Sequence, residues 1–222
     1  MINVSPQLKK MSPIFPNLID PQKDNQHMPM FPIDKKAFFK ASLYPDTIKG
    51  KKSLMVKISG DTDESLVEAF YNLTDLYTLF KSKEIEVPDE ILISFQSPGG
   101  YITQGLEIVN FINYTNKFRT PKISFLADSD ICSMGLYIFL CGKRRFSSSL
   151  ASFMIHPLSS HISDNLPSLQ QELKYLIEQQ KNLDSMIIKK TNIKKKTLDD
   201  LSHNWYIYPH EAKTLGIIED II

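Results

Sequence analysis

From residue 54 to the C-terminus, short apolar runs alternate with stretches in which apolar residues recur at helical spacing. Residues 54–58, 91–95 and 122–126 have the length and composition of buried strands. Helical stripes separate these runs, and a further strand is expected within 145–155. Because strands joined by helices usually pair in parallel, the pattern predicts an α/β fold with a mainly parallel sheet flanked by helices.

The expected helices follow from the apolar stripes and from residues suited to helix ends. Asp61 or Thr62 can cap the first helix, and Asn165 can cap the longest one. Residues 133–140 predict a buried helix, because they are small or apolar on every side. A short helix is expected from Pro209 to Gly216, followed by a closing strand over 217–222.

The first 50 residues differ from the rest of the chain. They hold seven of the 13 prolines, each of which removes a backbone donor and fixes φ. They also hold several methionines and phenylalanines, and a segment of this composition is too apolar for a free tail. We therefore expect a Pro-rich N-terminal arm over residues 1–50 that packs on a domain over 51–222 or on a neighbouring subunit.

Composition excludes several classes of partner and location. A net charge of +1 gives no reason to expect nucleic acid, and no apolar run approaches the roughly 20 residues that cross a membrane. Two cysteines rule out a disulfide framework, and the N-terminus lacks a secretory signal. We expect a cytoplasmic protein, or one of an organelle matrix or stroma, with no metal site and no cofactor.

Three local features together suggest a hydrolytic site. Gly99 and Gly100 follow a predicted strand, where a backbone without Cβ atoms can lie against a ligand. Ser133 heads the buried helix, next to Met134, and His156 ends an apolar strand. Each feature alone is commonly structural. Together they offer the nucleophile, the base and the backbone donors that serine peptidase chemistry needs.

The order of these motifs resembles one family. Ser-Pro-Gly-Gly, Ser-Met-Gly, Arg-Arg-Phe, Met-Ile-His-Pro and a final Glu-Ala followed by Leu-Gly-Ile-Ile-Glu-Asp resemble the proteolytic subunit of the Clp protease over residues 54–222. The resemblance implies a ClpP/crotonase-like fold with a protruding handle helix. It also implies homo-oligomeric rings and a partner AAA+ unfoldase ATPase.

The resemblance assigns roles to individual residues. It makes Ser133 the nucleophile and His156 the general base, with the amides of Gly100 and Met134 facing the oxyanion. It implies a serine-type endopeptidase that hydrolyses unfolded protein substrates. A peptide substrate would lie as an added strand beside the glycine pair.

One position departs from the family pattern. Where the family has the aspartate of the triad, this chain has Asn204. An amide oxygen can accept the histidine Nδ1–H, but it cannot offset the charge of an imidazolium. Asp164, Asp199 and Asp200 are the other candidates for a group that orients His156.

Other functions remain open from the sequence. The asparagine favours, as an alternative, a catalytically weak or inactive subunit with a structural or regulatory role in a mixed ring. A crotonase-type acyl-CoA enzyme would share the fold without needing the serine–histidine pair. A serine–lysine peptidase is a further possibility, although Met-Ile-His favours histidine as the base.

Overall fold

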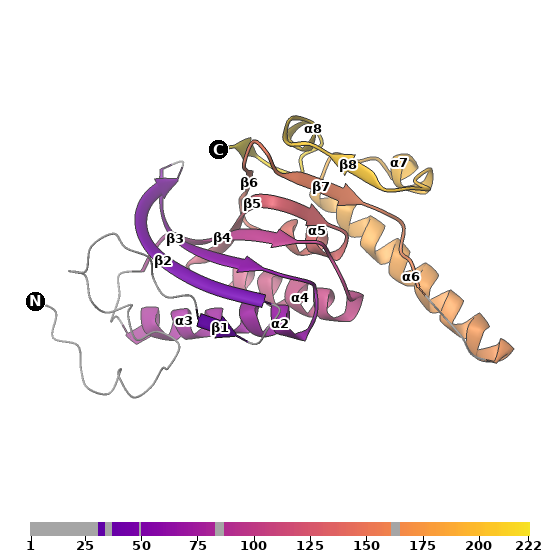
Figure 1. Cartoon of the computed structure of the whole chain (residues 1–222), viewed down its shortest axis with the longest axis horizontal. Coiled ribbons are helices and arrows are strands. Elements are labelled where there is room, and N and C mark those ends of the chain that lie inside the picture. Colours follow the sequence, from indigo (N-terminus) through magenta and orange to yellow (C-terminus); the bar gives the residue numbers. More distant parts are fainter. Residues whose placement is uncertain (1–30, 34–36, 49, 83–86, 161–164) are drawn as a thin grey trace, which may run out of the picture.

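The computed structural model describes residues 31–33, 37–48, 50–82, 87–160 and 165–222 (Figure 1). Its strands are β1 (Phe31–Ile33), β2 (Ala37–Ile48), β3 (Lys51–Ser59), β4 (Glu90–Ser97), β5 (Lys122–Cys132), β6 (Arg145–Ser147), β7 (Ser152–Ile155), β8 (Trp205–Ile207) and β9 (Asp220–Ile221). Its helices are α2 (Glu64–Tyr71), α3 (Leu73–Ser82), α4 (Ile102–Phe118), α5 (Met134–Phe139), α6 (Leu166–Lys190), α7 (Lys195–Asp199) and α8 (Pro209–Thr214).

The sheet runs in the order β1-β2-β3-β4-β5-β6-β9, with β7 and β8 branching from β5. Strands β3, β4, β5, β6 and β9 pair in parallel, whereas β1–β2, β2–β3 and β7–β8 pair antiparallel. Strand β5 changes partner along its length. Its residues 125–127 pair with β6 and its residues 130–132 with β7. This change brings the end of β7 beside the end of β5.

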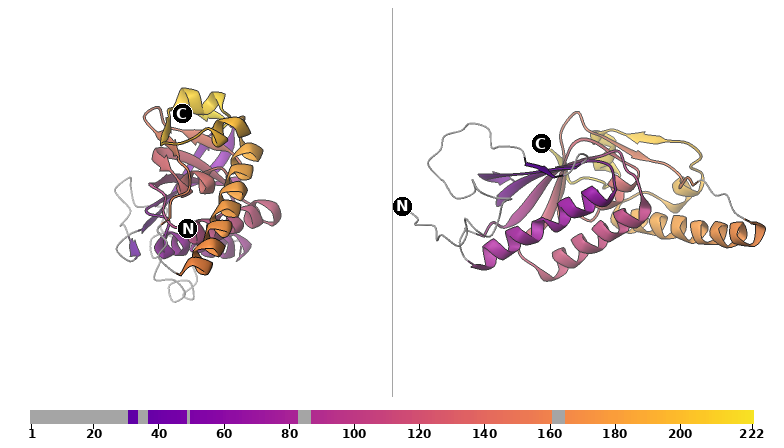
Figure 2. Two further views of the ribbon diagram at one scale, coloured as in Figure 1. Left: turned by 90° about the vertical axis from the view of Figure 1, so that its right-hand side faces the viewer. Right: turned by 60° about the horizontal axis from the view of Figure 1, so that its bottom comes forward.

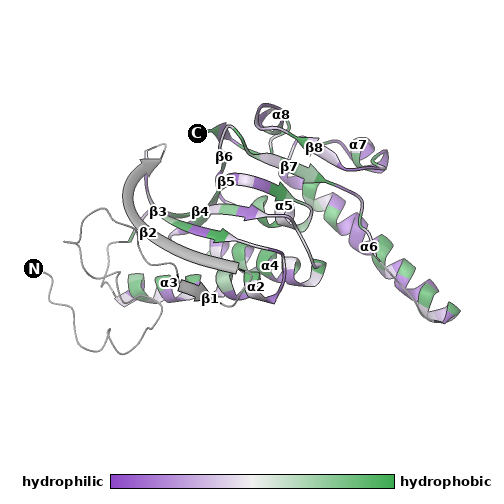
Figure 3. Ribbon diagram, in the orientation of Figure 1, coloured by the Kyte–Doolittle hydropathy of each residue, from purple (hydrophilic) through white to green (hydrophobic). Residues whose placement is uncertain are grey.

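Helices cover one face of the sheet and one helix leaves the body. Figures 1 and 2 show α2, α3 and α4 along the same face, while α6 projects beyond the sheet. In α6 the buried residues are Leu183 and Ile187, near its C-terminal end. Apolar residues continue into the projecting half (Figure 3), where Leu173 and Ile177 are exposed. A mainly parallel sheet with a protruding handle helix is the predicted fold class, and this prediction is confirmed.

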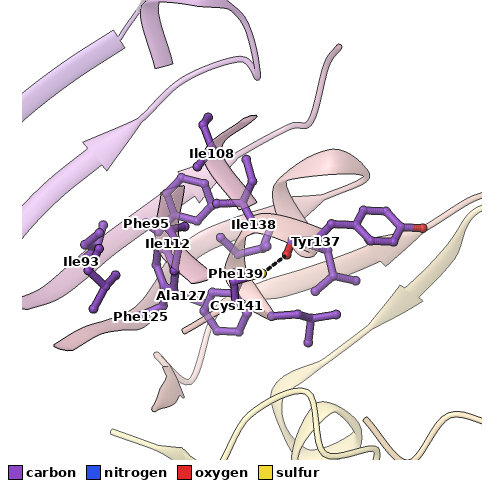
Figure 4. Close-up of a cluster of buried hydrophobic side chains, with 14 of the residues drawn as sticks. Ile93, Phe95, Ile108, Ile112, Phe125, Ala127, Tyr137, Ile138, Phe139 and Cys141 are labelled. Atoms are coloured by element: carbon purple, nitrogen blue, oxygen red, sulfur yellow. Dashed lines mark hydrogen bonds between the residues drawn. The ribbon is translucent and has the colours of Figure 1, made fainter. Parts of the chain in front are cut away.

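The core lies between the sheet and the helices. Phe95, Phe125, Phe139 and Phe153 are fully buried and contact one another in sequence, with ring centroids 5.3–5.7 Å apart along the row. Figure 4 shows the first three of them within the buried cluster. The row therefore ties α5, whose residues are all buried, to β4, β5 and β7. Burial of aromatic side chains of this size is a major source of stability.

Several predicted boundaries need correction. The N-cap of the first helix is Asp63, whose carboxylate accepts from the amides of Ser65 and Leu66, rather than Asp61 or Thr62. The strand expected within 145–155 is two short strands, β6 and β7, and the closing strand is confined to β9. Helix α7 and strand β8 were not predicted.

Part of the predicted arm belongs to the sheet. Strand β2 pairs with β3, and its register shifts between Ser42 and Asp46, a stretch that contains Pro45. Proline lacks the donor that a ladder needs, so a bulge is where a strand can hold one. Residues 1–30 lie outside the described residues, and the division of the chain at residue 50 stays a prediction. None of the described helices is long and apolar enough to cross a membrane.

Candidate active site

Neighbouring parallel strands end at one edge of the sheet, and the predicted site residues follow them. Gly99 and Gly100 come after β4, Ser133 directly after β5 and His156 directly after β7. β5 pairs in parallel with both other strands, so the carboxyl ends of all three lie together. This is where open α/β sheets gather ligand sites.

Ser133 and His156 meet at this edge. The Oγ of Ser133 lies 2.7 Å from Nε2 of His156, and Nδ1 of the same ring lies 2.7 Å from the carbonyl oxygen of Pro157. A carbonyl can only accept, so the second bond requires a proton on Nδ1. In a neutral ring Nε2 then carries the lone pair and accepts from the serine hydroxyl. This is the tautomer that a general base needs.

The backbone of Ser133 is strained and held on both sides. It has φ 52° and ψ −126°. Among the described residues, Ser133 is the one residue other than glycine that has a positive φ. Its amide donates to the carbonyl of Met154 at 2.9 Å, and its carbonyl accepts from the amide of Leu136 at 3.0 Å. Its side chain does not cap α5. The hydroxyl is therefore available to His156, and strain of this kind is typical of functional sites.

The glycine pair lies against the serine and is fixed by Thr62. Gly99 has φ 98° and Gly100 has φ 147°, conformations that favour glycine. The amide of Thr62 donates to the carbonyl of Gly99 at 2.7 Å, and the amide of Tyr101 donates to the carbonyl of Thr62 at 2.8 Å. A Cβ on Gly100 would lie 2.7 Å from the carbonyl oxygen of Thr62.

The amides of Gly100 and Met134 are the predicted oxyanion donors. Within the described part of the chain, neither donates to a backbone carbonyl. Met134 is the first residue of α5, whose leading amides have no acceptor inside the helix. The next residue, Gly135, packs directly on β4, since a Cβ there would lie 2.8 Å from Cβ of Ser97. Their role as oxyanion donors stays a prediction.

Asn204 directly precedes β8, the strand that pairs with β7. The antiparallel register of β7 and β8 ends at Ile155 opposite Trp205, so the next step of the register places Asn204 opposite His156. The Asn204 side chain is exposed, and no hydrogen bond joins it to a described residue. The role of Asn204 in a triad is untested by this arrangement.

Two of the three aspartates named as alternatives bond to lysines instead of the histidine. Asp199 and Asp200 are exposed and pair with Lys195 and Lys196, at 2.6 Å and 2.7 Å. Asp164 lies outside the described residues. The carbonyl of Pro157, which does contact the ring, was missed by the sequence analysis, because a backbone acceptor leaves no signature in side-chain identity.

The surroundings of Ser133 offer no competing chemistry in the described residues. Burial, and to a lesser degree the charge of Asp130, raises the pKa of the Cys132 thiol, which keeps it protonated and weakly nucleophilic. The described residues contain no group of His, Cys, Asp and Glu side chains suited to a metal ion. An open cavity of about 650 Å³ lies along α4 and is not lined by Ser133 or His156.

A serine hydroxyl bonded to a histidine, beside a glycine pair at the carboxyl edge of a parallel sheet, defines a candidate α/β serine hydrolase. Comparison with known protein families matches residues 54–222 to the family described as Clp protease. The chain belongs to the Clp protease family. Membership of this family implies a peptidase.

Proposed function

We propose that this protein is a serine-type endopeptidase that cleaves peptide bonds of unfolded protein substrates. The observation that carries the proposal is the 2.7 Å hydrogen bond between Ser133 Oγ and His156 Nε2, on a ring whose Nδ1 is the donor to Pro157. Family membership supports the same reaction class.

The proposed reaction proceeds in two steps. Ser133 Oγ attacks the carbonyl carbon of the scissile bond while His156 Nε2 takes the hydroxyl proton. The C–N bond breaks, and the same proton passes from Nε2 to the leaving amine, which leaves an acyl ester on Ser133. Water then attacks the ester with His156 as base, which releases the acid and restores the serine.

The oxyanion of each tetrahedral intermediate would accept from the amides of Gly100 and Met134. Loss of one such donor in serine peptidases costs about 10²- to 10³-fold in kcat. The positive φ of Ser133 and of the glycine pair supports this arrangement, and Gly99 lies directly against Ser133. An extended peptide would pair with the backbone next to Gly100, which explains tolerance of many side chains.

Two groups are candidates for orienting His156. Asn204 is one, because it precedes Trp205, which pairs with the residue before His156, and its amide oxygen can accept Nδ1–H. The Pro157 carbonyl is the other, and it accepts from Nδ1 in the structure. Both are neutral, so the imidazolium formed during attack would lack the adjacent carboxylate of a Ser-His-Asp triad.

We further propose self-association into rings and cooperation with an AAA+ unfoldase ATPase, as the family implies. The exposed apolar residues of the projecting α6 support self-association, because patches of this kind usually mark contacts. We expect the protein in the cytoplasm, or in an organelle matrix, acting without a cofactor.

The test is hydrolysis of an unfolded, fluorescently labelled protein by wild type, Ser133→Ala and Ser185→Ala. Ser185 is an exposed serine of α6 and serves as the matched control. We expect hydrolysis by wild type and Ser185→Ala, and its loss in Ser133→Ala. Equal hydrolysis by Ser133→Ala would overturn the assignment.

A second function, an inactive or regulatory subunit of a mixed ring, is favoured by the absence of a carboxylate at position 204. Under this alternative the isolated, assembled protein does not hydrolyse the substrate, yet it co-purifies with an active relative. Hydrolysis by the isolated protein that depends on Ser133 would exclude it.

A further inference from the structure

A continuous chain of hydrogen bonds runs from the histidine ring to a carboxylate on the projecting helix. His156 Nδ1 bonds the carbonyl oxygen of Pro157 at 2.7 Å, and the amide of Leu158, in the same peptide group, donates to Oε1 of Gln180 at 2.7 Å. Nε2 of Gln180 then donates to Oδ1 of Asp184 at 2.7 Å. The histidine, the peptide group, the Gln180 amide and the carboxylate thus form one directed series of donors and acceptors.

We infer that Gln180 and Asp184 are positioning residues of the active site, which hold the Pro157–Leu158 peptide group so that its carbonyl orients His156. This inference rests on the proposed function of Ser133 and His156. It assigns a site role to two residues of α6 that touch neither the substrate nor the reacting atoms.

The peptide group is fixed at both ends, which is what an orienting acceptor requires. Its carbonyl accepts from the ring, and its N–H is held by Gln180, so the plane cannot rotate without breaking both bonds. Pro157 restricts φ at the same point. Bonds arranged in series also polarise one another, so the carboxylate end strengthens the acceptor at the histidine end.

Gln180 is suited to the middle of this series. The peptide N–H needs an acceptor and the Asp184 carboxylate needs a donor, and one amide side chain supplies both. The two side chains stand four residues apart on α6, so they share one face of the helix. A carboxylate or an apolar side chain at position 180 cannot make both bonds.

Helix α6, which carries the carboxylate end, packs against α5, the helix that follows the nucleophile. Burial, reinforced by the negative charge of Asp184, raises the pKa of Tyr137, a buried residue of α5. Leu158, at the other end of the series, packs against the hydrophobic core. One face of α6 therefore contacts both the segment after Ser133 and the segment after His156.

The test compares Gln180→Met, Asp184→Asn and the control Gln171→Met with wild type. Methionine matches glutamine in length and helix propensity but offers no amide, and Gln171 is an exposed glutamine of the same helix. The rate of reaction of Ser133 with a fluorophosphonate and the steady-state constants for a peptide substrate are measured. The tautomer of His156 is read from ¹⁵N chemical shifts of histidine-labelled protein, assigned with His156→Ala.

We expect Gln180→Met to lower kcat about 10- to 100-fold with KM little changed, since misplacing a catalytic group by about 1 Å has effects of this size. Asp184→Asn should lower kcat less than Gln180→Met does, because the asparagine amide oxygen can still accept from Gln180. In wild type the ring proton should reside on Nδ1, and Gln180→Met should show a rising share of the Nε2–H tautomer. A residue with a purely structural role would leave the tautomer unchanged.

Retention of both the rate and the Nδ1–H tautomer in Gln180→Met overturns the inference. If Gln180→Met does not fold, the same two readouts on Asp184→Ala, which removes the acceptor of the Gln180 amide, decide it, and an unchanged tautomer and rate there count against the inference. The tautomer measurement needs no turnover, so it judges the hydrogen-bonded series even if Ser133 proves unreactive. Unreactive wild type with the expected tautomers would reject the peptidase and keep the positioning role.

Discussion

Gly99 lies directly against Ser133, since a Cβ atom on Gly99 would stand 2.6 Å from Cβ and 3.1 Å from Oγ of the serine. It would also stand 2.9 Å from the carbonyl oxygen of Cys132. Both neighbours belong to the strained turn that presents the hydroxyl. The turn after β4 and the turn after β5 are therefore packed without space for a methyl group, which makes the position of the hydroxyl dependent on glycine.

Gly99→Ala should displace Ser133 and reduce kcat/KM by about 10²-fold or more, because a shift of about 1 Å at a reacting group has this cost. Gly50→Ala is the matched control: Gly50 also has positive φ, 81°, but a Cβ there meets no atom within 4 Å. Peptide hydrolysis by both variants tests this. Equal activity of Gly99→Ala and Gly50→Ala would show that the close approach is not needed.

Ser133→Gly should be more stable than Ser133→Ala. Both variants remove the hydroxyl, but only glycine relieves φ 52°, a conformation that costs about 1–3 kcal/mol for other residues. The entropy of glycine in the unfolded chain offsets about 0.5–1 kcal/mol of that gain. Urea denaturation of the two variants gives the difference directly, and a more stable Ser133→Ala would contradict the strain.

The buried ion pair of Glu90 and Arg144 should make stability depend on acid pH. Burial alone would raise the pKa of Glu90, but hydrogen bonds from Arg144, Ser124 and Ser53 outweigh it and lower the pKa below its ordinary value of 4.5. A lowered folded-state pKa contributes stability above the unfolded value. That contribution is lost as the pH falls through the folded value.

Glu90→Gln should therefore cost about 3 kcal/mol at pH 7, the low end for breaking a buried pair. Below about pH 4.5 the free energy of unfolding of Glu90→Gln should fall less steeply with decreasing pH than that of wild type. Asp199→Asn, which breaks an exposed pair with Lys195, should change the free energy of unfolding by less than about 0.5 kcal/mol. Denaturant unfolding at several pH values measures both, and parallel pH curves for Glu90→Gln and wild type would refute the linkage.

Asn204→Asp tests the group opposite His156. A carboxylate at this register position would stabilise the imidazolium that forms as Ser133 attacks the probe, so we expect fluorophosphonate labelling at least as fast as in wild type. Stopped-time intact mass gives the rate. Labelling slower than wild type by tenfold would show that position 204 does not face the ring during reaction.

The projecting half of α6 should mediate self-association. Leu173 and Ile177 are 56% and 46% exposed and share a helix face at i, i+4 spacing. Leu173→Lys should lower the assembled mass, because each buried leucine contributes about 1.5–3 kcal/mol per contact. Light scattering after size exclusion measures the mass, with Lys174→Ala, an exposed neighbour, as control. An unchanged mass in Leu173→Lys would place the contact elsewhere.

The alternation of strands and helices was readable from the sequence because burial on both faces leaves continuous apolar runs. Strands β3, β4 and β5 show this and were predicted. Strand β8 was missed, because its three residues, with Tyr206 exposed, lack a run that stands out from a loop. Strands β6 and β7 merged into one in the prediction, since only pairing with different parts of β5 separates them.

The serine–histidine pair was also within reach of sequence reasoning, because Ser133 and His156 each follow a recognisable strand. Their orientation was not. The acceptor for Nδ1 is a backbone carbonyl, and the residues that hold it come from α6, more than 20 positions away. Spacing along the chain carries no information on such a contact. In the folded structure the Leu158 amide nitrogen lies 2.7 Å from Oε1 of Gln180.

The most direct measurement is intact-mass analysis of the assembled protein after reaction with a fluorophosphonate, followed by peptide mapping of the adduct. Because His156 Nε2 accepts the proton of Ser133 Oγ in the structure, we predict one adduct per chain on Ser133 and none in Ser133→Ala. An adduct on another residue, or no adduct on folded, assembled wild type, would contradict a nucleophilic Ser133.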